Sequence, residues 1–178
     1  MNFNDFKNLV MSRQSCRGFT DKEIPKEDLE KICSLVRYAP SACNSQPWKL
    51  YCVSGEQERQ KIAEFLQKNT RNGFTSSAKA FIVISELPAV LKKDVQQAYS
   101  PTHFTKYDIG EMTAYITLTA KSLGIDSCII GWVDRQGIKE YLNFSSEEEC
   151  YIVVALGYSN APLRDKVRKD EKEFIKYL

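Results

Sequence analysis

The chain has 178 residues, 43% hydrophobic and 27% charged, a composition typical of one globular domain that buries its own core. Its net charge of +2 gives no case for nucleic-acid binding. No apolar run approaches the length of a membrane span, and the first residues lack a signal-peptide pattern. Six scattered cysteines without a C-x-x-C pair, and one histidine, predict a cytoplasmic protein with reduced thiols and no metal site.

Two amphipathic helices are predicted at the start of the chain. Asn4 is expected to cap the first, which carries Phe6, Leu9 and Val10 on one face. The second follows Pro25, with apolar residues at helical spacing and Glu and Lys on the opposite face.

The segment between these helices carries a candidate anion-binding group. Arg13, Ser15 and Arg17 alternate, so an extended backbone would project all three to one side. Two guanidiniums flanking a hydroxyl suit a phosphate or a polarised carbonyl. Lys166 and Arg168 alternate in the same way near the C-terminus. The alternative interpretation is that these are solvated surface charges.

The loop after the second helix is rich in proline, hydroxyl and amide side chains. Pro40 and Pro47 restrict its backbone, and Ser41 and Asn44 are short polar groups of the kind that position a planar, polar ligand. Trp48 then opens a strand. The alternative is an ordinary turn built from Ser, Asn and Pro.

The rest of the chain alternates between strands and helices. Strands are predicted at residues 48–53, 80–84, 127–130 and 151–157, and helices at about 56–68, 90–97, 109–123 and 135–142. Asp108 is expected to start the long helix and Gly124 to end it, and Asp134 to cap the short one. The long helix has few charges on any side, which indicates a central helix or a subunit contact. The stretch 85–107 is either a cover over a pocket or plain surface.

Four motifs occur in order along the chain. They are the stretch Arg13-Gln14-Ser15-Cys16-Arg17, the loop from Pro40 to Trp48, Ile130-Gly131 after a short strand, and Ala155-Leu156-Gly157-Tyr158 followed by Lys166 and Arg168. With this order and spacing, the chain resembles the nitroreductase family of FMN-dependent oxidoreductases over nearly its whole length. The resemblance implies an α+β sandwich in which a central mixed, mostly antiparallel sheet is flanked by helices. It also implies an intertwined homodimer of single domains, residues 1–178, with a C-terminal arm from about residue 158.

The resemblance also implies the FMN contacts. Its phosphate and ribityl contacts fall on Arg13 and Ser15, with a neighbouring contact at Gln14. The pyrimidine-edge contact falls on Arg17, and the C-terminal phosphate clamp on Lys166 and Arg168. The flavin ring contacts fall on Pro40, Ser41 and Asn44 of the partner subunit's loop, and on the turn at Ile130 and Gly131, whose backbone N–H faces flavin N5.

Some positions leave alternatives open. Ile130 stands where many larger members carry an acidic residue, so any side-chain role there is lost. A further polar contact is expected near the end of the third helix, from Gln67, Asn69 or Arg71, without a choice among them. Cys43 inside the flavin loop is read as an inert thiol, with a redox-sensitive one as the alternative.

The function implied by the resemblance is ping-pong electron transfer. NADH or NADPH delivers a hydride to flavin N5, and a small aromatic acceptor, a nitroaromatic or a quinone, then takes the electrons. The flavin carries the chemistry, so no catalytic side chain is required. The alternatives are a flavin-binding storage or sensor module without turnover, and a reductive dehalogenase or heterocycle dehydrogenase of the same fold.

Overall fold

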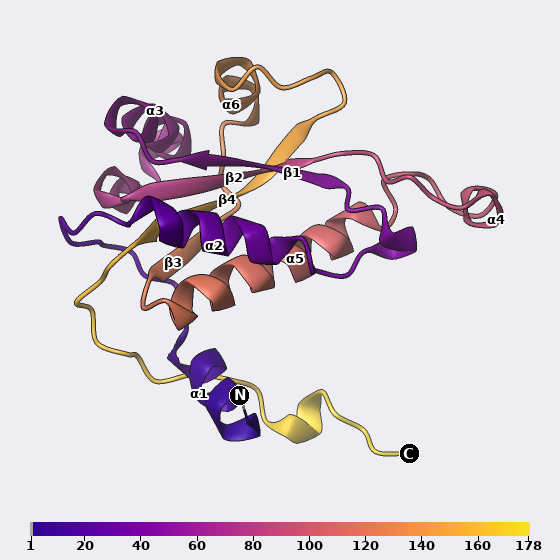
Figure 1. Ribbon diagram of the computed structural model, residues 1–178. Coiled ribbons are helices and arrows are strands. Elements are labelled where there is room, and N and C mark those ends of the chain that lie inside the picture. The colour runs from indigo at the N-terminus through magenta and orange to yellow at the C-terminus, as the bar shows by residue number, and fades with distance from the viewer. Residues whose placement is uncertain (1) are drawn as a thin grey trace.

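The computed structural model describes residues 2–178, apart from the side chain of Asn69. Helices cover both faces of a single sheet (Figure 1). The helices are α1 (Phe3–Ser12), α2 (Lys26–Val36), α3 (Glu56–Leu66), α4 (Lys93–Gln96), α5 (Thr105–Ser122) and α6 (Arg135–Tyr141). The strands are β1 (Trp48–Val53), β2 (Ala80–Glu86), β3 (Asp126–Ile130) and β4 (Glu149–Gly157).

The sheet has the strand order β1-β2-β4-β3, and each neighbouring pair runs antiparallel. The central strand β2 is buried along its whole length, as its continuous apolar run predicts. An isolated parallel bridge joins Ser15 to Ser127 at the free edge of β3. The prediction of an α+β fold with a mostly antiparallel sheet between helices is confirmed.

Side-chain alternation along the strands divides the interior into two cores. Ile82 and Leu156 point to the face covered by α2 and α5. Phe81 and Val153 point to the opposite face, covered by α3 and α6. The long helix α5 is central, as expected, because its buried stripe runs along the first core.

Two helix starts were predicted wrongly. Asn2, not Asn4, caps α1, and it does so in a reciprocal capping box with Asp5. Helix α5 begins at Thr105, so Asp108 lies inside its first turn instead of capping it. The side chain of Asp108 accepts a hydrogen bond from another loop, so its tertiary role replaced the local one. The cap at Asp134 and the end of α5 at Gly124, which has φ of +75°, are confirmed.

Helix α1 and the C-terminal arm lie at the margin of the body, where α1 contacts α5. They lie side by side below it, and α4 projects at another corner (Figure 1). No residue of α1 is buried, and the arm from residue 160 onward is almost entirely exposed. Within residues 2–178, we find no helix that combines the length and the apolar character needed to cross a bilayer.

A buried carboxylate fastens the loop before β4 to the sheet. Glu148 accepts hydrogen bonds from the hydroxyls of Tyr51 and Ser85, both at 2.7 Å, and from the backbone N–H of Ser145. Burial raises the pKa of Glu148, but these donors and nearby Lys49 outweigh burial and lower it from 4.5 to about 2. The ionised carboxylate therefore stabilises the folded chain.

We expect Glu148→Ala to lower the free energy of unfolding by about 1–3 kcal/mol, because the buried hydroxyl of Ser85 and the part-buried hydroxyl of Tyr51 lose their acceptor. The folded-state pKa of Glu148 is depressed, so its contribution is present above pH 4.5 and disappears as the pH falls towards 2. Denaturant unfolding between pH 3 and pH 7 measures both effects. Glu64→Ala, at an exposed ion pair with Lys61, is the control. An E148A variant as stable as the parent at pH 7 would contradict this account.

Candidate functional site

The segment that leaves α1 lies along the free edge of β3. Ser15 forms the parallel bridge with Ser127, and the N–H of Cys16 donates to the carbonyl of Ser127 at 3.0 Å. The backbone here is extended, so Arg13, Ser15 and Arg17 alternate with Gln14 and Cys16, which are buried. The predicted alternation is present. Its cause is the burial of Gln14 and Cys16, which leaves the side chains of Arg13, Ser15 and Arg17 on the outward side of the segment.

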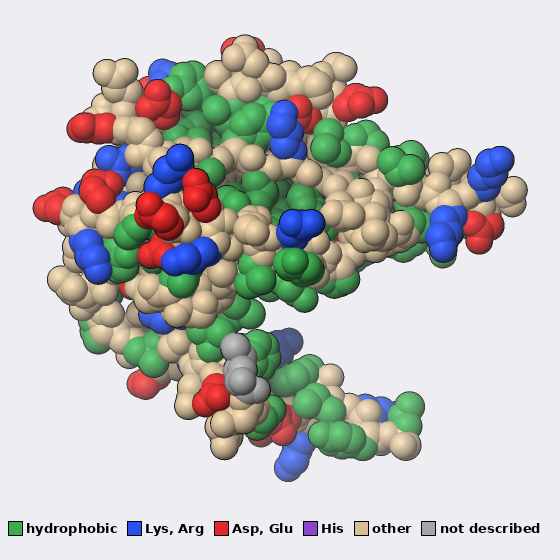
Figure 2. All heavy atoms as spheres, in the orientation of Figure 1, with side chains coloured by type: hydrophobic (Ala, Val, Ile, Leu, Met, Phe, Trp, Pro, Cys, Tyr) green, Lys and Arg blue, Asp and Glu red, His purple; other side chains and the backbone are tan. Residues whose placement is uncertain are grey.

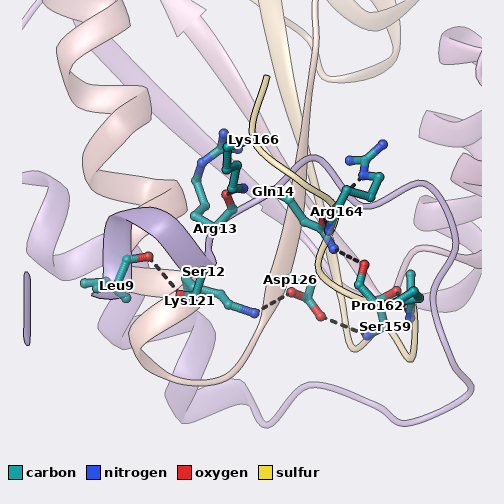
Figure 3. A network of polar contacts seen from close by, with 11 residues as sticks. Leu9, Ser12, Arg13, Gln14, Lys121, Asp126, Ser159, Pro162, Arg164 and Lys166 are labelled. Atoms are coloured by element: carbon teal, nitrogen blue, oxygen red, sulfur yellow. Dashed lines mark hydrogen bonds and ion pairs between the residues drawn. The ribbon is translucent and has the colours of Figure 1, made fainter. Parts of the chain in front are cut away.

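The C-terminal arm crosses this segment and is tied to it by hydrogen bonds (Figure 3). Gln14 donates to the carbonyl of Pro162 and accepts from the backbone N–H and the Nε of Arg164, at 3.0 to 3.2 Å. Arg164 also donates to the carbonyl of Ser15 at 2.7 Å, and Lys166 to that of Arg13 at 2.6 Å. Two segments about 150 residues apart in the chain thus form one surface.

Asp126, at the start of β3, fixes the base of the arm. It accepts from the ammonium of Lys121 at 2.8 Å and from the backbone N–H of Ser159 at 3.0 Å (Figure 3). These contacts connect the end of α5, the edge strand and the first residues of the arm. The position of the arm is therefore set by a partly buried charged group as well as by Gln14.

The crossing creates a cation-rich pocket of about 350 Å³. It is lined by Arg13, Gln14, Ser15, Arg17, Arg164, Asp165, Lys166, Val167 and Arg168. Within the described part of the chain, none of its five cationic side chains has an ion-pair partner. Burial, followed by the charges of Arg13, Arg168 and Arg164, lowers the pKa of Lys166. We call this group of residues the cation pocket; it is suited to a multiply charged anion.

The C-terminal end of β3, with the turn at Ile130 and Gly131, continues the free edge of the sheet beyond the cation pocket. Ile130 is buried in the core and Gly131 is exposed. The segment after α3 lies beside this turn, since the indole N–H of Trp132 donates to the carbonyl of Lys68 at 3.2 Å. The guanidinium of Arg71 lies over the indole ring, 5.0 Å from its centroid.

The three candidate contacts after the third helix differ in their availability. The side chain of Gln67 donates to Thr75 and Ser76, so it holds the following turn. Arg71 is exposed beside the Gly131 turn. The side chain of Asn69 lies outside the described residues. Of the two that are described, Arg71 is the exposed one, while the side chain of Gln67 is committed to the following turn.

The loop of residues 40–47 has a constrained backbone. Cys43, Asn44 and Gln46 all have positive φ, between 48° and 55°, a conformation that costs energy for residues other than glycine. The loop is held by tertiary contacts. Oδ1 of Asp108 accepts from the N–H of Ala42 at 3.1 Å, while Oδ2 of this buried carboxylate has no partner in the described residues.

This loop and the cation pocket lie at opposite ends of α5. Asp108 contacts the loop near the start of the helix, and Lys121 contacts Asp126 near its end. At about 1.5 Å per residue, these two positions are about 20 Å apart along the helix axis. One chain therefore brings together Arg13, Gln14, Ser15, Arg17, Lys166 and Arg168, with Ile130 and Gly131 farther along the same strand edge. It does not bring Pro40, Ser41 and Asn44 to them.

Arg164 is a pocket residue that was not among the predicted contacts. Its sequence signal was available, because Arg164, Lys166 and Arg168 form one alternating series. Asp126 and Lys121 were also missed, and nothing in their local sequence indicates that they anchor a distant arm.

Comparison with known structures defines the class of protein. The fold matches that of a nitroreductase-like protein of Streptococcus mutans with a TM-score of 0.85, at 20% identity over 99% of this chain and 100% of that one. It also matches an FMN-dependent nitroreductase of Clostridium difficile with a TM-score of 0.74, at 22% identity over 95% and 96% of the two chains. The chain thus has the nitroreductase fold.

Comparison of sequences then establishes the family. A model of the nitroreductase family matches residues 10–158. An Archaeoglobus fulgidus protein, provisionally named NADH dehydrogenase/NAD(P)H nitroreductase, is 31% identical over 170 residues, which cover 93% of this chain and 87% of that protein. The chain belongs to the nitroreductase family, so the predicted family and its enzyme class, an oxidoreductase, are confirmed.

We expect Asp108→Ala to destabilise the chain by about 1–2 kcal/mol, because it leaves the N–H of Ala42 without its acceptor and releases the strained loop. Asp108→Asn is the matched control, since its amide oxygen can still accept this hydrogen bond. Limited proteolysis should cut residues 40–47 faster in D108A than in D108N. Equal cleavage rates in both variants would show that Asp108 does not hold the loop.

Proposed function

We propose that this chain is an FMN-dependent NAD(P)H oxidoreductase that reduces small aromatic acceptors such as nitroaromatics and quinones. The observation that carries the proposal is the cation pocket, where five cations converge and none has an ion-pair partner among the described residues. Such an arrangement calls for an external anion, and the phosphate of FMN is a dianion. A family neighbour of the same fold is named an FMN-dependent nitroreductase, which supports this ligand.

The described residues fit the phosphate end of FMN. Arg13, Lys166 and Arg168 supply charge, and the hydroxyl of Ser15 supplies a neutral donor at the same wall. Gln14 contributes in another way, since its amide is already bonded to Pro162 and Arg164. We assign Gln14 the role of holding the arm so that the cations converge.

The edge of β3 suits the flavin ring. The carbonyl of Ser127 faces outward to Cys16, and backbone groups of a strand alternate in direction, so the backbone of Ile129 also faces this edge. Gly131 is two residues after Ile129, so the same alternation would turn its N–H towards the free edge, where it can face flavin N5. Arg17, exposed beside this edge, can stabilise negative charge on the pyrimidine ring.

We propose that the partner copy of a homodimer supplies Pro40, Ser41 and Asn44, because the loop of one chain lies too far from its own cation pocket. A large uncovered apolar surface supports this assembly. Helix α1 has no buried residue, and Phe3 is 77% exposed. Hydrophobic side chains, drawn in green, gather on the lower part of the molecule, which α1 and the C-terminal arm form, and around the hollow above it (Figure 2). A second copy would cover these surfaces.

The residues of the chain bind and orient, and the cofactor does the redox chemistry. Bound FMN supplies a hydride acceptor and donor at N5, used alternately by NADH or NADPH and by the acceptor, so the expected kinetics are ping-pong. The cation pocket anchors the phosphate, the strand edge supports the ring, and the partner's loop covers it. Each chain, a single cytoplasmic domain of residues 1–178, would contribute its cation pocket and strand edge to one flavin and its loop to the other.

The visible spectrum of the purified protein, before and after anaerobic addition of NADH or NADPH, tests this function. We expect a flavin spectrum that either donor bleaches, and reoxidation by a quinone. A bound flavin that stays oxidised with both donors would contradict the oxidoreductase proposal and favour a flavin-binding module. Failure to take up added FMN would contradict the cofactor assignment.

We expect Lys166→Ala and Arg13→Ala each to weaken FMN binding by about 10- to 100-fold, because each removes a charge-assisted contact to the phosphate. Titration of the apoprotein by quenching of FMN fluorescence measures the dissociation constant. Lys26→Ala is the control, because Lys26 is an exposed residue paired only with Glu30. Equal affinity in K166A and K26A would place the phosphate elsewhere.

The affinity for FMN should also depend on pH through Lys166. Its pKa in the free protein is already lowered, and a bound phosphate would raise it, so binding is strongest while the ammonium is protonated. We expect affinity to fall as the pH rises from 7 through the lowered pKa, below the ordinary value of 10.5. A Lys166→Arg variant should lose this dependence, because a guanidinium does not titrate in that range.

A further inference from the structure

Two cysteines from different elements lie on facing surfaces of α2 and β1. Cys33 follows the buried Ile32 on α2 and packs against the same core cluster as Trp48 and Leu50 of β1. Cys52 is two residues beyond Leu50, so strand alternation points its side chain to this same face, towards α2. Helix α2 and strand β1 are in direct contact, so both side chains lie in the region between these two elements.

The two thiols interact and differ in accessibility. The hydrogen bond with Cys52, together with burial, raises the pKa of Cys33. The same contact lowers the pKa of Cys52, whose side chain is exposed near the end of β1. Cys52 is therefore the thiol that ionises first and meets solvent, and Cys33 is the half-buried neighbour behind it.

The other cysteines lack this combination. Cys16, Cys128 and Cys150 are buried, and burial raises the pKa of each. Cys43 is half-buried in the loop of residues 40–47. Among the six cysteines, Cys52 is the exposed one, and it has a thiol next to it.

We propose that Cys52 and Cys33 form a redox modification site, at which hydrogen peroxide converts the thiol pair into a disulfide. The Cys52 thiolate attacks the peroxide; an S–O bond forms, the O–O bond breaks, and water leaves after protonation. Cys33 then attacks the Cys52 sulfur; an S–S bond forms, the S–O bond breaks, and a second water leaves. With hydrogen peroxide, two thiols and one peroxide give one disulfide and two waters.

The position of this disulfide gives it a structural consequence. Residues 33 and 52 bracket the loop of residues 40–47, so the bond would tie the two ends of the segment that carries the loop. Oxidation would thus restrain the loop without involving the cation pocket. The proposal concerns α2 and β1 only, and it holds or fails independently of FMN binding.

The test is peroxide treatment of the full-length protein followed by peptide mapping under non-reducing conditions. We expect a cross-linked peptide pair containing Cys33 and Cys52, the loss of two free thiols, and recovery of both with dithiothreitol. A wild-type map in which Cys52 is oxidised but never joined to Cys33 would overturn the proposal, whatever the variants do.

Serine variants separate the roles of the two residues. In Cys33→Ser, Cys52 should stop at the sulfenic acid, which dimedone traps. In Cys52→Ser, Cys33 should keep its thiol at the peroxide dose that oxidises the wild type. Cys43→Ser is the matched control and should form the Cys33–Cys52 bond as the wild type does. Loss of two thiols in C52S, by pairing of other cysteines, would contradict the assignment.

Discussion

The repulsion among five cations at one pocket is the constraint on which the site depends. Like charges at close range oppose each other, and no carboxylate of the described residues, Asp165 of the lining included, forms an ion pair with any of them. They are held by hydrogen bonds to the backbone, with Arg164 on the carbonyl of Ser15 and Lys166 on that of Arg13. The buried amide of Gln14 completes the junction. Folding energy from these contacts thus maintains a positive field ready for an anion.

A second constraint lies at the far end of α5, where the loop of residues 40–47 keeps a strained backbone. Tertiary contacts from Asp108 and from the Val90 segment, whose N–H donates to Ser45 at 2.6 Å, hold it. Helix α5 therefore separates the loop of residues 40–47 from the cation pocket, and the two do not meet within one chain. The proposed homodimer, in which each loop reaches the other chain's pocket, would account for both and for the exposed apolar surface of α1.

Local patterns predicted the elements well and their starts less well. The continuous apolar runs and helical spacings identified all four strands and the long helices, because burial on a sheet or helix face imposes a period on the sequence. The start of α1 was misplaced because two asparagines compete nearby and only Asn2 forms a capping box with Asp5. Asp108 was misread because its tertiary hydrogen bond cannot be seen in a local pattern.

The sequence by itself determined which residues could share a side: Arg13, Ser15 and Arg17 in one series, and Lys166 and Arg168 in another. Alternation is a local property of extended backbone, so it can be read without a structure. Only the tertiary structure decided that these series meet, through contacts such as that between Gln14 and Arg164. That meeting depends on the packing of β3 and the arm, because contacts between distant segments arise only once the intervening chain has folded.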